Sequence, residues 1–164
     1  MATADRAFIN AEQRAFNWLE TKLSDITAGA NGYIGELPIA LGEQHPVVKE
    51  RQMWMFGITG QNETMSSNVG NPVHCHKATA IFRGMFETRE MALNIVGSFR
   101  SFLPAQVHSL VQRLDYSEGL TIGRDVVELR NDQDKGGLHR IWIVEQPLWI
   151  QFSNDDETIG YEGN

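Results

Sequence analysis

The sequence lacks the residues needed for an internal disulfide or for a membrane-spanning helix. It contains one cysteine, Cys75, which has no second cysteine to pair with and suits a reducing compartment. No stretch approaches the roughly 18–20 consecutive apolar residues of a transmembrane helix. Residues Met1–Asn10 contain no apolar core of a signal peptide. We therefore expect a protein made in the cytoplasm of its host, with no membrane partner.

Basic residues are also scarce. The chain has 14 lysines and arginines against 21 acidic residues, a formal net charge of -7 at pH 7. A sequence-general nucleic-acid binder needs a clustered basic face to neutralise phosphates, and the arginines here are scattered. The balance excludes that class, but it is compatible with a protein that lies beside DNA without binding it.

Catalytic and cofactor motifs are missing as well. No Gly-x-Ser-x-Gly elbow and no dinucleotide or Walker glycine pattern occurs. The most metal-like cluster is His74, Cys75 and His76, but adjacent residues on one strand are not the spaced pairs of a zinc site. We expect a polar cluster at the start of a strand instead. The sequence predicts no catalytic residue, no cofactor and no metal ligand, and hence not an enzyme.

Two amphipathic helices are predicted from apolar residues at three- and four-residue steps. The first begins at Asn10, with Gln13 in capping-box position. Its buried stripe is Ala15, Phe16, Leu19, Leu23 and Ile26. The second begins at Thr88 and ends before Pro104. Its stripe is Met91, Ala92, Ile95, Val96, Phe99, Phe102 and Leu103.

Strand-like segments fill most of the remaining chain. They are a short segment at 33–37 and longer ones at 52–60, 73–86, 107–117 and 139–152, with a weaker strand or loop at 120–130. Pro147 is expected at a bulge, break or edge, because it lacks an amide donor. This order predicts one α+β domain over residues 1–152: a single, mainly antiparallel sheet with two principal helices packed on one face. Residues 153–164 are predicted to be an acidic, flexible tail.

The central strands are apolar on both faces, which a sheet open to water on one side is not. On the strand 52–60, Trp54 and Phe56 point one way while Met53 and Met55 point the other. The second face must therefore be covered. A neighbouring subunit is the economical candidate, and a loop of the same chain is the alternative.

This succession of elements resembles the tail-terminator proteins of long-tailed bacteriophages. The resemblance covers residues 8–152 and rests on the first helix, the strand–loop–strand unit, the second helix and the closing strands. It implies a structural virion protein, located in the tail or neck. Such proteins form a homohexameric ring on the tail tube, stop tube growth and present a docking surface to a head-completion or stopper protein. Genomic DNA would pass through an acidic lumen without specific binding.

Candidate contact residues come from one loop and from the second helix. Residues 61–72 are predicted to be a long polar loop, a kind of segment that is usually functional or disordered. The predicted protein-binding residues are Gln61, Asn62, Glu63, Met65, Asn68, Arg89 and Arg100. Two alternatives remain: a neighbouring head–tail adaptor or stopper, or, in a different class, a small α+β hydrolase or ligand-binding domain that uses the His74–His76 region.

Overall fold

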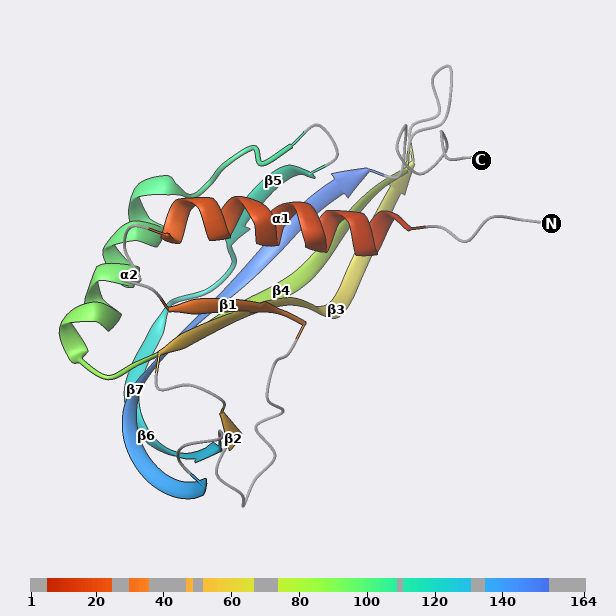
Figure 1. The fold of residues 1–164 in the computed structure, drawn as a ribbon. Coiled ribbons are helices and arrows are strands. Elements are labelled where there is room, and N and C mark those ends of the chain that lie inside the picture. Colours follow the sequence, from red (N-terminus) through yellow and green to blue (C-terminus); the bar gives the residue numbers. More distant parts are fainter. Residues whose placement is uncertain are drawn as a thin grey trace.

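The structure, a computed structural model, describes residues 6–24, 30–35, 47–48, 52–66, 74–108, 111–130 and 135–153. These residues form two helices, α1 (Ala7–Leu23) and α2 (Arg89–Phe102), and one seven-stranded sheet. The strands are β1 (Asn31–Ile34), β2 (Val47–Val48), β3 (Met53–Ser66), β4 (His74–Phe86), β5 (Val111–Tyr116), β6 (Thr121–Arg130) and β7 (Lys135–Ser153). Their order is β1-β3-β4-β7-β6-β2, and β5 also pairs with β7 (Figure 1).

The sheet is mainly antiparallel, as predicted. Only the short ladders at its two margins, β1 with β3 and β2 with β6, are parallel. The long ladders β3–β4, β4–β7 and β6–β7 are antiparallel. The α+β prediction is therefore confirmed. The weak segment at 120–130 is a full strand, because it pairs along its length with β7.

Helix α1 begins earlier than predicted, and Asn10 lies inside it rather than at its cap. The amide of Asn10 already donates to the carbonyl of Arg6, at 2.8 Å. No side chain caps this end, but Ala7 and Ala11 are fully buried, and this packing extends the helix by almost a turn. The predicted stripe is buried from Ala15 to Leu23, while Ile26 lies outside the described residues.

Helix α2 begins as predicted. The Thr88 hydroxyl accepts a hydrogen bond from the amide of Met91 at 3.2 Å, which satisfies one of the free donors of the first turn. Its buried residues Ala92, Ile95 and Phe99 join the same apolar cluster as those of α1. Both helices therefore cover one face of the sheet, and Figure 1 shows them lying together against it.

Aromatic side chains fill the space between the helices and the sheet. The Trp54 ring on β3 lies 5.1 Å from that of Phe16 and 5.6 Å from that of Phe82, and Phe99 meets Phe82 edge-on at 4.6 Å. Gly32 on β1 permits this arrangement, because a Cβ there would lie 2.3 Å from the Trp54 ring. This face is the main core of the protein.

The second face carries a smaller cluster that the chain buries by itself. Met53, Met55, Met85, Val127 and Ile141 are at most 3% exposed in the single chain. The two-sided apolar pattern is thus confirmed. A neighbouring subunit, which the sequence favoured as the cover of this face, is not needed to bury this cluster. At this end of the sheet the β6–β7 hairpin curls strongly, and β2 pairs with β6 (Figure 1).

Pro147 lies in the middle of β7, not at a bulge or end of that strand. It is paired with Ile81 on β4, and on its other side the partner of β7 changes from β5 to β6. The Pro147 carbonyl accepts from the amide of Ser117 in that gap, at 3.0 Å. The missing amide donor therefore faces the break between two strands, where no ladder needs it.

The predicted loop at 61–72 is wrong over residues 61–66, because β3 continues to Ser66, while residues 67–72 lie outside the described residues. Gly60 and residues 62–66 pair with β4 up to the last pair, Ser66 with His74. Two register shifts, between Ile58 and Gly60 and between Gly60 and Asn62, accommodate the change from apolar to polar sequence. Ladder pairing with β4 thus outweighs the turn-like composition of this segment.

Candidate functional site: an open sheet edge and a polar hollow

The longest strand edge that no other described strand pairs with is the outer edge of β3. Strand β1 pairs only with Met53–Phe56, so no described strand pairs with the outer side of β3 from Gly57 to Ser66. A strand edge of this length offers unpaired amides and carbonyls to any extended segment that approaches it. In the described part of the chain, this edge is the best-formed template for joining another chain.

The Glu12 side chain blocks strand pairing at the start of this edge. The amide of Ile58 donates to the Glu12 carboxylate at 2.9 Å, and the bond is partly buried. Helix α1 positions Glu12 by packing Phe16, one turn further on, against Trp54. A carboxylate that occupies an edge amide prevents a strand from pairing there, so the edge is open mainly beyond Ile58.

The structure separates the predicted contact residues into two groups. Gln61, Asn62, Glu63 and Met65 all lie on β3 along the open edge strand, and Asn68 is outside the described residues. Their partners on β4 lie at its Cys75–Ala78 end.

Arg89 and Arg100 form the second group, on α2 beyond the opposite end of β4. Both are exposed, as the predicted polar side of that helix requires. Arg89 lies over the ring of Trp142 at 5.9 Å, and Arg100 over that of Tyr116 at 5.4 Å. The β3 residues and these arginines therefore do not form one site.

Within the His74–Cys75–His76 segment, the side chains of Cys75 and His76 lie on opposite faces of the sheet. The His76 ring packs against Phe8 and Phe152, each at 5.3 Å, on the helix face. Cys75 faces the other way, where its sulfur lies 3.2 Å from the Gln151 amide nitrogen and 3.5 Å from the Gln112 amide oxygen. Among the described residues, no group of three or more His, Cys, Asp or Glu side chains could hold a metal ion.

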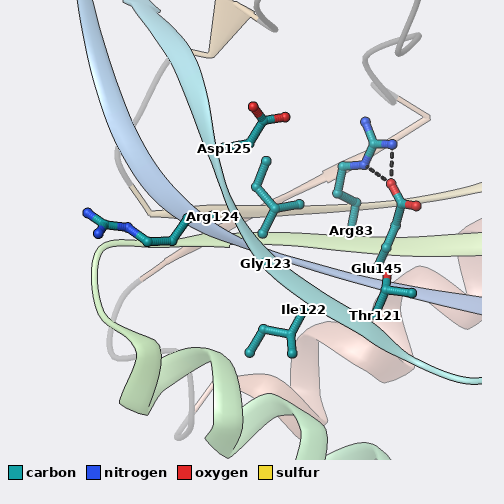
Figure 2. A pocket seen from close by; sticks show the side chains of 8 residues that line it. Arg83, Thr121, Ile122, Gly123, Arg124, Asp125 and Glu145 are labelled. Carbon is teal, nitrogen blue, oxygen red and sulfur yellow. Dashed lines mark hydrogen bonds and ion pairs between the residues drawn. The ribbon is translucent and has the colours of Figure 1, made fainter.

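A polar hollow of about 390 Å³ opens on the second face, above the junction of β4, β7 and β6. Figure 2 shows Arg83, Glu145 and Asp125 projecting on one side of the sheet, while Ile122 points toward the helices. Gly123 widens the hollow, because nothing lies within 4 Å of where its Cβ would be. The lining residues are Arg83, Thr121, Ile122, Gly123, Arg124, Asp125, Ile143 and Glu145.

An ion pair forms one wall of this hollow. The Arg83 guanidinium donates to a single Glu145 oxygen through both Nε, at 2.6 Å, and Nη2. The Arg83 side chain is 12% exposed and that of Glu145 is 33% exposed, so the guanidinium is more shielded from solvent than the carboxylate. Sequence analysis missed the pair. Its signal was a charged residue of opposite sign within each of two doubly apolar strands.

Comparisons with known proteins add no assignment to this geometry. No protein-family model and no curated protein matches the sequence. Within the described residues, no helix is both long and apolar enough to cross a membrane.

Proposed function

We propose that this protein is a structural subunit that assembles with copies of itself into a ring, and that the ring is the tail terminator of a long-tailed bacteriophage. The observation that carries the proposal is the outer edge of β3 beyond Ile58, which no described strand pairs with up to Ser66. Stable monomers cover, shorten or charge such edges, whereas an assembling subunit can use one for pairing. The protein acts by assembly, not by catalysis.

Ring closure needs a contact between two different surfaces of the subunit. Adding a strand to the β3 edge is a contact of this kind whenever the partner strand comes from another part of the neighbouring copy. Repetition of one such contact closes into a ring if the rotation allows it. The order of elements, a helix followed by a hairpin, a second helix and closing strands, agrees with the resemblance seen in the sequence.

The net charge of -7 fits the same role. A ring through which genomic DNA passes must not hold the duplex, and acidic side chains repel phosphates within a Debye length of about 10 Å. The proposed neighbours are the tail tube protein below the ring and a head-completion or stopper protein above it.

Light scattering and electron microscopy of the purified protein test the assembly. A subunit has a mass of 18.5 kDa, so a ring gives an integral multiple of that value and a ring-shaped particle. Addition to growing tail tubes should then fix their length. A protein that stays at the subunit mass at all concentrations, including in the presence of tubes, would refute the ring.

A charge placed on the edge tests the β3 contact itself. Thr59 is exposed on β3, and its hydroxyl lies 3.3 Å from that of Thr79, so Thr59→Lys puts an ammonium beside the open edge. We expect at least a tenfold weaker association with little change in melting temperature. Gln106→Lys, an exposed position outside the strands, is the matched control and should associate normally. Equal association of the two variants would remove the edge from the interface.

A neighbouring head–tail adaptor or stopper is the alternative within the same class. It would also form a ring, but it would bind the head side and leave tube length unregulated. The tube-length measurement separates the two assignments.

A further inference from the structure

A cationic and aromatic patch lies on the second face of the sheet, next to the edge strand β3 and away from the polar hollow. Lys77 on β4 and Arg113 on β5 are both paired with Gln151, the central residue of the same row on β7. Trp149 lies two residues earlier on β7. The Lys77 Nζ is 4.5 Å from the Trp149 ring centroid, and the Arg113 guanidinium carbon is 5.3 Å from it.

This patch has positive charge available for a partner. The Arg113 side chain is 51% exposed, and it bonds Asp115 at 3.0 Å through one nitrogen of its guanidinium. Lys77 makes no ion pair within the described part of the chain, where its contact is the Trp149 ring. A half-buried indole flanked by two cations suits a segment that combines carboxylates with apolar side chains.

The chain itself contains such a segment directly after the sheet. Strand β7 ends at Ser153, and residues 154–164 follow it in the sequence. This stretch has no lysine or arginine, and it includes the apolar side chains of Ile159 and Tyr161. Its carboxylates are Asp155, Asp156, Glu157 and Glu162.

Distance also favours this segment. Ser153 and Trp149 are about 13 Å apart along β7, at 3.3 Å per residue. A chain with the length of residues 154–164 reaches up to about 36 Å, so it can reverse and still cross the patch. We propose that Lys77, Arg113 and Trp149 form a binding site for an acidic segment, and that residues 154–164 of the same chain occupy it. The proposal is independent of ring assembly.

The second flanked tryptophan provides a natural control. Trp142 has Arg89 at 5.9 Å and Arg124 at 5.7 Å, the same chemistry as at Trp149. However, it joins the cluster on the helix face and lies about 36 Å from Ser153 along β7. Residues 154–164 would have to pass around the sheet to reach it. Each tryptophan has two cations beside it, so the two sites differ mainly in position. The acidic segment should therefore lie near Trp149 and not near Trp142.

A paramagnetic label on the full chain measures this contact. The label is attached at Thr158→Cys in a Cys75→Ser background, and line broadening is read at the indole N–H of each tryptophan. We expect strong broadening at Trp149 and little at Trp142. The double substitution Lys77→Gln/Arg113→Gln should reduce the Trp149 broadening at least twofold, and raised salt should do the same. Arg89→Gln/Arg124→Gln should leave it unchanged.

Two results would overturn the proposal. Equal broadening at Trp149 with and without the two patch cations would show that proximity alone, and not the charge of the patch, brings the label near. Broadening that passes from a labelled copy to an unlabelled, isotope-enriched copy would place the segment on a neighbouring chain. Unchanged signals of Trp54 would verify that each variant keeps its core.

Discussion

The two faces of this sheet are built from the same strands but are packed by different means. On the helix face, interlocking rings of Phe16, Trp54, Phe82 and Phe99 lie between the sheet and both helices. On the second face, three methionines and two aliphatic residues form a smaller cluster at the curled end. Elsewhere that face is polar, with the ion pair, the hollow and the cationic patch.

Because of this difference, we expect the helix face to supply most of the stability and the second face to supply groups for contacts. Aromatic rings in stacked, tilted and edge-to-face contacts define one packed arrangement, whereas methionine side chains adapt to an irregular space. The helix face therefore carries most of the apolar burial. The second face buries a smaller cluster, and it leaves charged groups exposed where another segment or subunit can reach them. Substitutions on the two faces should differ accordingly.

The largest effect is expected for Phe99→Ala on the helix face. Phe99 is 1% exposed and contacts Phe82 at 4.6 Å and Phe102 at 5.7 Å, so truncation leaves a cavity among rigid rings. We expect a loss of about 3–5 kcal/mol in the free energy of unfolding, measured by urea titration. A loss below about 1 kcal/mol would mean that α2 does not pack on the sheet.

A smaller loss is expected for Met85→Ala on the second face. Met85 is also fully buried, but its neighbours include the flexible side chains of Met53 and Met55. Partial collapse of these side chains into the cavity should limit the loss to about 2–3 kcal/mol, at the low end for methionine truncation. A loss equal to that of Phe99→Ala would show that the two clusters are equally rigid.

Replacing one strand glycine on each face with alanine compares how tightly the two faces are packed, because each substitution adds a single methyl group. A Cβ at Gly84 would lie 2.5 Å from the Phe86 ring on the helix face, whereas a Cβ at Gly123 would meet nothing within 4 Å. We expect Gly84→Ala to cost about 1–3 kcal/mol through overpacking. Gly123→Ala should be within about 0.5 kcal/mol of the parent in the same titration. Equal costs would show that the hollow beside Gly123 is filled in solution.

The sequence was sufficient for the features that depend on periodicity. The α2 cap at Thr88, the buried stripes of both helices and the two-sided apolar strands follow from spacing alone, because helices and strands expose their faces at different periods. The start of α1 was missed because burial of Ala7 and Ala11 outweighs the cap signal at Asn10.

Features that depend on ladder pairing were harder to predict. The polar residues 61–66 read as a loop by composition, yet they are held as a strand by β4. The Glu12–Ile58 bond joins residues 46 positions apart, and the Arg83–Glu145 pair residues 62 apart. At such separations, nothing in the local sequence shows which two residues will pair. The sequence named Gln61, Asn62, Glu63 and Met65 as contact residues, but only the structure shows that they lie on a strand edge. The hollow and the cationic patch likewise came from the structure.

A small effect is also expected for the Arg83–Glu145 pair, which tests how open the second face is. We expect a coupling of about 1 kcal/mol from a double-mutant cycle with Arg83→Met and Glu145→Gln, measured by urea titration. Glu145 is 33% exposed, so solvent screens the pair and 1 M salt should weaken it further. Glu145→Gln should cost more than Arg83→Met, because it leaves a nearly buried guanidinium without this carboxylate, whereas the exposed carboxylate can be rehydrated.

Protein concentration provides the decisive control for this pair. In a subunit whose second face stays open, the coupling is the same at low and high concentration. If a neighbouring copy covered the hollow on assembly, the pair would lose its solvent, and its coupling would change as the subunits associate. A coupling above about 3 kcal/mol that falls on dilution would therefore contradict an open second face and would place a subunit contact over the hollow.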